Sequence, residues 1–310
     1  MPRHALPVLA ALLLPPVLVA CGPRPPDTAG RGRERTVGVT LLTRGHLFYR
    51  DLEEGLTEAA KRHRIRLVVT TADFDLGRQS SQIEDFVAQK VDAIVVCPVD
   101  SKGVGPAIRK ANAAGIPVFT ADIAAQEGEV VCHVASDNVA GGRLAGAYLA
   151  KRLGGRGKIA IVDQPAITSV LDRVHGFRSE IAKSPGLSVV ADVNGQGVRD
   201  KSLEAASDVL QAHPDLDAVF GINDDSALGA LDAVRQFKRE RIVIVGYDAT
   251  PPAADAIRKG SPLVADVVQD PRRIGTTTVD RIADHLEGRP VPRVVPVPVA
   301  IVDKDTLEKK

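Results

Sequence analysis

Short apolar runs rich in Val, Ile and Ala alternate along the chain with longer amphipathic stretches. The runs with the length and β-branched content of buried strands are 37–42, 67–70, 93–96, 118–120, 159–162, 218–222 and 242–245. Between the first two, Leu52, Leu56 and Ala59 recur at helical spacing. Strands that are apolar on both faces and separated by helices are typical of parallel sheets covered on both sides. The pattern predicts the α/β class.

Two segments of the chain repeat one pattern. VDAIVVCPVDSKGVGPAIRKANAAGIPVFTAD (91–122) and LDAVFGINDDSALGALDAVRQFKRERIVIVGYD (216–248) each hold an Asp-Ala start, a strand, a polar tip, a helix, a second strand and a final Asp. Right-handed βαβ units all look alike, which is one explanation; two domains of the same build are the other. Ligands bind beyond the carboxyl ends of parallel strands. Asp122, Asn223 and Asp248 follow such ends, so two facing halves would bring them into one cleft.

A polar triplet, Asn223-Asp224-Asp225, separates an apolar run from a helical pattern. Side chains of this kind beside a helix start commonly cap it by accepting backbone N–H bonds. Catalysis, a metal or a bound ligand would use the same groups. The triplet alone does not separate these roles.

The N-terminal residues have the features of an export signal. Residues 1–20 carry Arg3 and an apolar run that three prolines interrupt, too short for a confident membrane span. The small residues before Cys21 are similar to a bacterial lipobox, in which that cysteine carries lipid; a signal peptide with a chance cysteine is the alternative. Residues 21–35, rich in Pro, Gly and Arg, are typical of a flexible tether.

Charge and cysteine content narrow the picture further. The net charge is +1 and the basic residues are spread along the chain, which gives no footprint for nucleic acid. Besides Cys21 the chain has only Cys97 and Cys132. In a sheet of order 2-1-3-4-5 one strand separates these two by about 9.6 Å, beyond the ~7 Å Cα limit for a disulfide. We therefore expect two free thiols.

Three segments are similar to those of one protein family. EVVCHVASDNVAGGRLAG (129–146), AHPDLDAVFGINDDSALGAL (212–231) and IVIVGYDATP (242–251) resemble the ribose-type periplasmic sugar-binding proteins of bacterial ABC importers. The resemblance extends from about residue 36 to the C-terminus. LacI-type repressors share the fold but carry a DNA-binding helix-turn-helix where this chain has the lipobox.

The resemblance implies two doubly wound parallel-sheet domains of similar build joined by a three-crossing hinge. The crossings would fall near residues 136–137, 269–270 and 298. The first domain would hold residues 36–136 plus 270–298, and the second 137–269 plus 299–310. Closure on the hinge would enclose the ligand.

The resemblance also implies a set of ligand-binding residues. Those that would hydrogen-bond sugar hydroxyls are Asp122, Asp248, Asn223, Gln269 and Arg173. The aromatic side chains that would cover the sugar ring are Phe48, Tyr49 and Tyr247, and His46 stands where an amide is common. Each hydroxyl both donates and accepts, so carboxylates, amides and an arginine fork suit it together. A solvated His46, an Arg173 paired on a helix surface, and a core position for Phe48 or Tyr49 are the alternatives.

Two positions depart from the family pattern. Ile123 follows Asp122 where members that hold ribose usually have arginine, and the loop NGQGVRD (194–200) lacks an expected aromatic. Compared with members that hold ribose, the expected site therefore lacks one arginine donor and one aromatic ring. We therefore expect a ligand other than ribose: another pentose, a hexose, a polyol or a sugar-like metabolite.

These observations predict a substrate-binding lipoprotein of an ABC sugar importer, a monomer without cofactor or metal that hands a neutral sugar or polyol to a permease. It would be exported and lipid-anchored, facing the periplasm or the cell exterior. Presentation of the ligand to a chemoreceptor or sensor kinase, or binding of a sugar-like signalling molecule, stays open. A glycosidase pair of Asp122 and Asp248 is the distant alternative, because HExxH, CxxC, Walker and GxSxG motifs are missing from the sequence.

Overall fold

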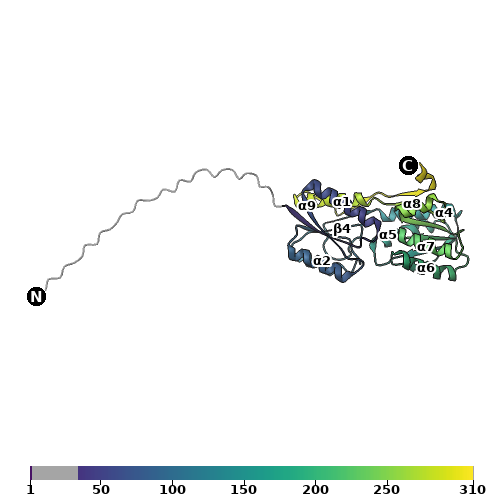
Figure 1. Cartoon of the computed structure of the whole chain (residues 1–310), viewed down its shortest axis with the longest axis horizontal. Helices are drawn as coiled ribbons and strands as arrows, with labels where there is room; N and C mark the ends of the chain where they lie inside the picture. The colour runs from purple at the N-terminus through teal and green to yellow at the C-terminus, as the bar shows by residue number, and fades with distance from the viewer. Residues whose placement is uncertain (2–33, 310) are drawn as a thin grey trace. The chain divides into compact units, whose positions relative to one another are not determined.

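The computed structural model describes Met1 and residues 34–309 of the chain. Residues 34–309 form two lobes, each built on one six-stranded sheet with helices packed on it (Figure 1). The predicted α/β class and doubly wound build are confirmed. The predicted signal peptide, Cys21 and residues 21–33 of the predicted tether lie outside the described residues.

The first lobe is built on a fully parallel sheet of order β2-β1-β3-β4-β5-β11, which confirms the predicted order 2-1-3-4-5. Its strands are β1 (Arg35–Leu41), β2 (Ile65–Thr71), β3 (Ala93–Val96), β4 (Val118–Ala121), β5 (Cys132–Ser136) and β11 (Val294–Val297). β3 and β4 are buried along their whole length, as strands covered on both faces are. β1 begins at Arg35, the last residue of the predicted tether.

The second lobe repeats this order with its own strands, β7-β6-β8-β9-β10-β12. They are β6 (Arg156–Asp163), β7 (Gly186–Asn194), β8 (Ala218–Gly221), β9 (Val243–Asp248), β10 (Leu263–Val268) and β12 (Ala300–Asp303). β12 is antiparallel to β10, and the other pairs are parallel. Residues 91–122 and 216–248 are alike because each supplies the third and fourth strands of its sheet.

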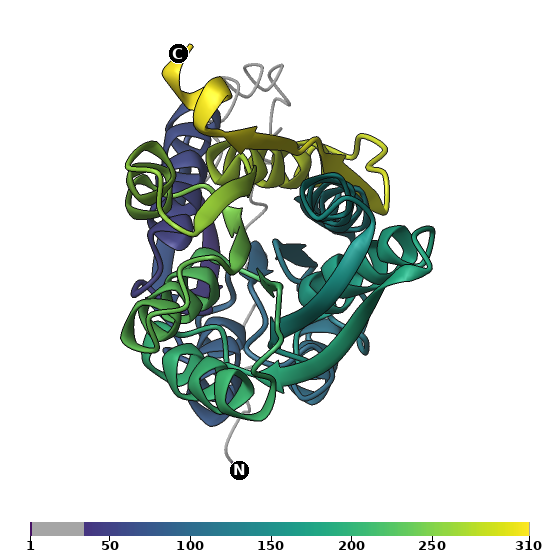
Figure 2. The same ribbon diagram turned by 90° about the vertical axis from the view of Figure 1, so that its right-hand side faces the viewer.

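Helices pack on the sheet of each lobe, and Figure 2 looks onto the second lobe. The helices of the first lobe are α1 (Leu47–His63), α2 (Leu76–Gln89), α3 (Gly105–Ala113) and α9 (Pro271–Leu286). Those of the second are α4 (Asn138–Arg152), α5 (Thr168–Ile181), α6 (Arg199–Ala212), α7 (Asp224–Gln236), α8 (Pro251–Arg258) and α10 (Lys304–Glu308). No helix within residues 34–309 is long and apolar enough to cross a bilayer.

The chain passes between the lobes at three places. β5 ends at Ser136 in the first sheet, and α4 begins at Asn138 and packs against the second. β10 ends at Val268 in the second sheet, and α9 begins at Pro271 and packs against the first. β11 and β12 supply the third passage. The residue boundaries expected for two separate domains stay a prediction, since residues 34–309 pack as one compact unit.

Glycine lets α4 and α5 approach closely in the second lobe. A Cβ on Gly142 of α4 would stand closer than 3.0 Å to the carbonyl oxygen of Arg173 in α5, and Gly176 of α5 would overlap the backbone of α4. A Cβ on Gly141 would meet the Tyr247 ring. The glycines of VAGGRLAG therefore serve helix packing, and this packing positions Arg173.

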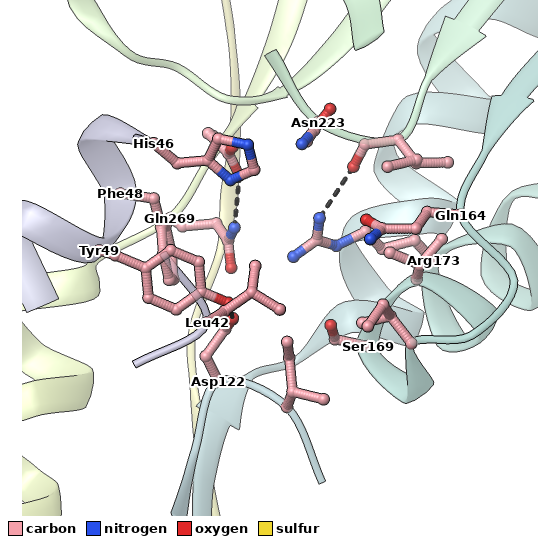
Figure 3. A pocket seen from close by; sticks show the side chains of 15 residues that line it. Leu42, His46, Phe48, Tyr49, Asp122, Gln164, Ser169, Arg173, Asn223 and Gln269 are labelled. Carbon is pink, nitrogen blue, oxygen red and sulfur yellow. Dashed lines mark hydrogen bonds between the residues drawn. The ribbon is translucent and has the colours of Figure 1, made fainter. Parts of the chain in front are cut away.

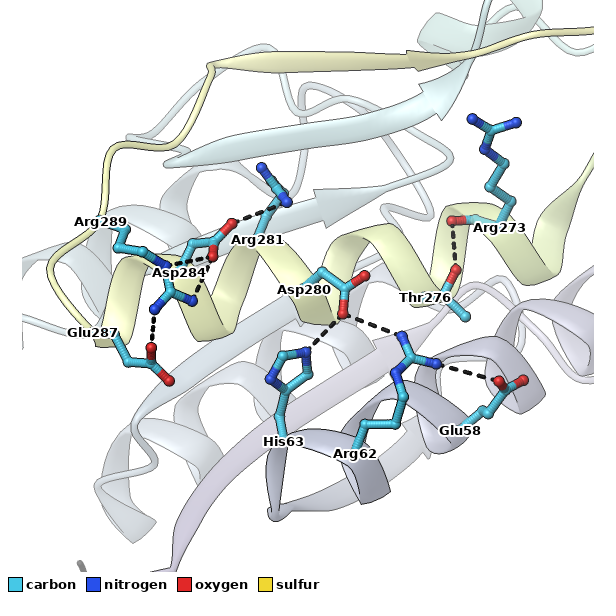
Figure 4. Close-up of polar contacts among 10 residues, drawn as sticks. All are labelled: Glu58, Arg62, His63, Arg273, Thr276, Asp280, Arg281, Asp284, Glu287 and Arg289. Carbon is cyan, nitrogen blue, oxygen red and sulfur yellow. Dashed lines mark hydrogen bonds and ion pairs between the residues drawn. The ribbon is translucent and has the colours of Figure 1, made fainter.

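Helices α1 and α9 make a similar contact in the first lobe. A Cβ on Gly55 of α1 would overlap the backbone of α9, and one on Gly275 of α9 would overlap that of α1. Asp280 of α9 lies 2.7 Å from His63 and 3.2 Å from Arg62 of α1 (Figure 4). These contacts hold α9 on the first lobe, although the chain reaches α9 from the second lobe.

The two cysteines of the first lobe are buried and free. Cys97 follows β3 and Cys132 opens β5, while β4 lies between them. Burial raises the pKa of the Cys97 thiol well above its usual value and that of Cys132 to about 11. The prediction of two free thiols is confirmed, and both are in environments that suppress thiolate chemistry.

Candidate functional site

A cavity lies between the two lobes, beyond the carboxyl ends of the parallel strands (Figure 3). The volume open to water inside it is about 40 Å³, enough for a few water molecules and below the ~300–1,000 Å³ of most small-molecule sites. Its lining residues are Leu42, His46, Phe48, Tyr49, Asp122, Ile123, Gln164, Ile167, Ser169, Val170, Arg173, Ile222, Asn223, Asp248 and Gln269.

Eight of the predicted ligand-binding residues line this cavity: His46, Phe48, Tyr49, Asp122, Arg173, Asn223, Asp248 and Gln269. The remaining one, Tyr247, is fully buried and is not part of the lining. Its ring centroid lies 3.9 Å from Cζ of Arg173. The structure thus gives Tyr247 the role of supporting the arginine, not the predicted role of covering a ligand.

Asp122 presents one free carboxylate oxygen to the cavity. The Tyr49 hydroxyl donates to its Oδ2 at 2.7 Å, whereas its buried Oδ1 has no partner among the described residues. Its backbone is left-handed, with φ of 66°, a conformation that Asp tolerates better than most residues. Burial raises the pKa of the Asp122 carboxyl, and the charge of Arg173 and the Tyr49 bond oppose that rise.

Asp248 and Gln269 form a second acceptor group. Nε2 of Gln269 donates to Oδ1 of Asp248 at 2.6 Å, and this bond leaves Oε1 of Gln269 buried without a donor among the described residues. Burial raises the pKa of Asp248 well above its usual value, and the charge of neighbouring Asp224 adds to the rise. Both side chains offer oxygens to hydroxyl donors.

Arg173 is held in place by second-lobe groups. Its Nε donates to Oδ1 of Asn138 and its Nη1 to the carbonyl oxygen of Ile222, both at 2.8 Å. The Tyr247 hydroxyl also bonds Oδ1 of Asn138, at 3.2 Å. The bonds to Asn138 and Ile222 use two of the five N–H donors of the guanidinium. The rest of the guanidinium reaches the cavity in a fixed orientation (Figure 3). Asn138, which sequence reasoning missed, lies within the quoted segment 129–146.

The residues of the triplet 223–225 have different roles. Oδ1 of Asn223 accepts from the backbone N–H of Ser226 at 2.8 Å, so Asn223 caps α7 while it also lines the cavity. Its Nδ2 donates to the Gly197 carbonyl at 3.0 Å. Asp224 accepts from the backbone and hydroxyl of Thr250 behind the cavity. Both interpretations of Asn223, helix cap and site residue, are compatible with this geometry.

His46 links the two lobes beside the cavity. Its Nε2 lies 3.2 Å from Oδ2 of Asp225 but has no well-aligned hydrogen-bond partner among the described residues. Burial lowers the pKa of His46, and the charge of Asp225 opposes the change. The ring of Phe74 packs edge-on to the imidazole at 5.5 Å. A solvated loop position for His46 is thus wrong.

Several lining residues escaped sequence reasoning. Gln164 and Ser169 follow β6, at a strand end equivalent to those of Asp122 and Asn223. The strand-end rule that found the other residues could have found them. The aliphatic residues Leu42, Ile123, Ile167, Val170 and Ile222 carry no such signal, because apolar side chains beside strands are usually core. Among residues 34–309, no group of His, Cys, Asp and Glu is arranged to hold a metal ion.

Comparison with known proteins identifies the family. Residues 37–290, most of the chain, match the periplasmic binding protein domain. The chain belongs to the periplasmic binding protein family. A relative in this family is the ribose import binding protein of Bacillus subtilis (strain 168), 35% identical over 291 residues, which cover 92% of this chain and 94% of that protein.

Solved structures of the family share the fold. An ABC transporter solute-binding protein from Bacillus halodurans C-125, with bound myo-inositol, gives a TM-score of 0.83 at 27% identity and covers 89% of this chain and 96% of that one. One from Mycobacterium smegmatis, with bound glycerol, gives 0.84 at 30% identity with the same coverage of both chains. The ribose-type, type I periplasmic binding protein fold predicted from three sequence segments is confirmed.

Proposed function

We propose that this periplasmic binding protein captures one neutral sugar or polyol between its lobes and delivers it to the permease of an ABC importer. The proposal rests on one observation. Buried acceptors that lack hydrogen-bond donors and a guanidinium of fixed orientation line the same cavity. The acceptors are Oδ1 of Asp122 and Oε1 of Gln269. Buried polar groups require partners, and a hydroxyl can donate to these oxygens while it accepts from Arg173.

Both lobes contribute to the grip. Tyr49 and Asp122 come from the first lobe, and Arg173, Asn223 and Asp248 from the second. A ligand bonded to both sets stabilises the closed arrangement over an open one by its differential affinity for the two. Phe48 covers part of the lining with an aromatic ring, which suits the C–H face of a sugar.

Holding suits these groups better than turnover. The carboxylates of Asp122 and Asp248 accept hydrogen bonds from Tyr49 and Gln269, which fix them as acceptors for ligand hydroxyls. We therefore propose a binding protein and not an enzyme. The compared relatives are named as binding proteins of importers, which supports a permease as the partner.

We further propose that the protein is exported, monomeric and tethered by lipid on Cys21, facing the periplasm or the cell exterior. The lipobox-like residues before Cys21 support the anchor. Stable anchoring takes two acyl chains or more, as a lipidated N-terminal cysteine would provide.

A thermal-shift screen of pentoses, hexoses, inositols and sugar alcohols tests the proposed function. A ligand present at about 100 times its Kd stabilises the folded state by ~2.7 kcal/mol. For a chain of this size that is a melting rise of roughly 5–10 °C. Incubation of any hit with the protein, followed by chromatography, should return the sugar unchanged. A screen without a hit, or conversion of the sugar, would contradict the proposal.

A further inference from the structure

One amide side chain of the cavity keeps both of its ends free. Gln164 follows β6 in the second lobe, lines the cavity and is half-buried. Its backbone N–H donates to Oδ1 of Asp163 at 2.7 Å, whereas its side-chain amide makes no hydrogen bond to any residue within 34–309. An oxygen acceptor and an NH₂ donor of Gln164 are therefore available to a ligand.

The other two amides of the lining are engaged by the protein. Asn223 accepts from a backbone N–H of α7 at 2.8 Å and donates to the Gly197 carbonyl at 3.0 Å. Gln269 donates to Asp248 at 2.6 Å, so only its oxygen remains. Of the three amides that line the cavity, Gln164 alone makes neither bond to the residues that the structure describes.

Gly197 provides the room for this amide. Its φ of 66° is left-handed, a conformation that suits glycine. A Cβ on Gly197 would stand 2.3 Å from Oε1 of Gln164, closer than any side chain allows. In the loop 194–200, where an aromatic residue was expected, the space beside Gly197 is thus taken by the Gln164 amide.

The amide lies across the cavity from aromatic side chains. Figure 3 shows Gln164 on the side of Arg173, and Phe48 and Tyr49 of the first lobe on the other side. A ligand held between the lobes therefore reaches the Gln164 amide on the side opposite these rings.

We propose that Gln164 binds the ligand and sets its specificity. Its oxygen accepts from one hydroxyl and its NH₂ donates to the next, so the cavity favours a ligand that presents two adjacent hydroxyls, a vicinal diol, to this amide. This inference rests on the proposed function, since it specifies the chemical class of the molecule held in that cavity.

The physical reason is that an amide and a diol have matching groups. The acceptor and the donor of the amide are attached to one carbon, and a hydroxyl can act as donor or acceptor. Each neutral bond strengthens binding by about 2- to 10-fold. A C–H group at the same place would remove water from the amide without replacing its hydrogen bonds.

The experiment uses isothermal titration calorimetry on the full chain. The probe is the tightest binder among D-ribose, D-xylose, D-glucose, D-galactose, myo-inositol and xylitol. Gln164→Leu keeps the approximate size and removes the amide, so we expect it to weaken probe binding by about 5- to 100-fold. Gln211→Leu, at an exposed glutamine of α6 outside the cavity lining, is the matched control and should bind like the parent.

Monodeoxy forms of the probe test the diol. Two forms that lack adjacent hydroxyls should each bind the parent about 3-fold or more weaker than the probe does. Gln164→Leu should bind these two forms and the probe equally, because the bonds that they lose are already absent from the variant.

Gly197→Ala tests the room for the amide. The added methyl would displace Gln164, so probe binding should fall by about 5-fold or more. In a Gln164→Ala background the same space is empty, and Gly197→Ala should change affinity little further. Equal losses in both backgrounds would show that Gly197 acts through the backbone alone and would contradict the inference.

The outcomes separate this inference from the function beneath it. Parent-like binding of the probe by Gln164→Leu would overturn the inference while the sugar-binding function stands. A monodeoxy series in which no adjacent pair loses its effect in Gln164→Leu would overturn the diol equally. If none of the six probes binds the parent, the proposed function fails and takes this inference with it.

Discussion

The Tyr49 hydroxyl donates a 2.7 Å hydrogen bond to Oδ2 of Asp122, so the tyrosine supports the carboxylate that faces the cavity. Tyr49→Phe removes this donor and keeps the ring. We expect ligand affinity to fall about 5- to 30-fold, roughly 1–2 kcal/mol, because the carboxylate is desolvated with one bond fewer. Calorimetric titration measures this change in ligand affinity. Tyr148→Phe, the same change outside the cavity lining, is the control, and equal binding by both variants would contradict this role.

Arg173→Ala removes the only arginine that lines the cavity within residues 34–309. We expect binding to weaken by about 1.5–3 kcal/mol, or roughly 10- to 150-fold, the range for hydrogen bonds to charged groups. Arg173→Lys keeps the charge but loses the fork, so it should also bind weakly. Arg178→Ala, at an exposed arginine of the same helix that pairs with Asp192, should bind like the parent. Parent-like affinity in Arg173→Ala would remove this residue from the site.

Asp224 and Asp266 are hydrogen-bonded to each other behind the cavity, and each has one buried oxygen that lacks a conventional donor. A proton shared by the two carboxyls would satisfy both oxygens. Burial raises the pKa of Asp224 to about 6 and that of Asp266 well above its usual value, the latter with help from the charge of Asp224.

Raised carboxyl pKa values give a definite sign to the stability profile. A carboxyl whose pKa is higher in the folded state stabilises that state below the unfolded pKa, and this stability is lost as pH rises through the folded pKa. For Asp224 the window runs from 3.8 to about 6, and for Asp266 it extends higher. We expect the unfolding free energy to fall across these windows.

Asp266→Asn tests the shared proton. Its amide can still accept from the N–H of Ala249 and can donate to Asp224 at any pH. Relative to the parent, the variant should gain unfolding free energy in urea between about pH 5 and pH 8. Asp255→Asn, at an exposed carboxylate, should follow the parent. A variant with the parent's pH profile would exclude a shared proton.

Gly142→Ala should strain the contact between α4 and α5. Its Cβ would meet the carbonyl oxygen of Arg173, which is backbone and moves only if α5 moves. We expect a loss of about 1–3 kcal/mol in unfolding free energy, the usual cost of overpacking, together with weaker ligand binding. Gly77→Ala places a methyl where it first meets the Asp75 side chain, so it is the milder control. Equal stability of the two variants would refute the close approach.

Cys21→Ser tests the anchor. We expect the variant to leave the membrane fraction on cell fractionation, because one lipidated cysteine is the anchor proposed for the chain. Ligand affinity should stay unchanged, since the cavity is lined entirely by residues beyond 41. Partition of Cys21→Ser with membranes as in the parent would refute the lipobox interpretation.

Much of the fold was predictable because the central strands are apolar on both faces. The runs at 93–96 and 118–120 lie in β3 and β4, which are wholly buried. β7 and β10 were not predicted. β7 is half-exposed at a sheet edge, and the run of β10 is interrupted by Asp266, a fully buried acid that pairs with Asp224. A search for short continuous apolar runs misses strands with either feature.

Much of the site was predictable because polar residues that follow parallel strands meet at one edge. The direction in which each side chain points was harder to predict. Tyr247 and Asp248 are neighbours at the end of β9, and adjacent side chains of a strand point to opposite faces. Asp248 lines the cavity and Tyr247 lies behind Arg173. Asp225, in the first turn of α7, pairs with His46 of the other lobe, a contact that depends on tertiary geometry.

The passages between the lobes place a mechanical pivot inside the binding site. α4 and α9 each cross from one lobe and are held to the other by glycine contacts, so any turning of the lobes would take place in the short links at 136–138 and 269–271 and in the third passage between β11 and β12. Asn138, which orients Arg173, and Gln269, which bonds Asp248, belong to these links. Atoms near an axis move least when a body rotates. We therefore expect Arg173 and Asp248, which are bonded to Asn138 and Gln269 of the links, to shift less relative to the links than side chains farther from them when the lobes turn.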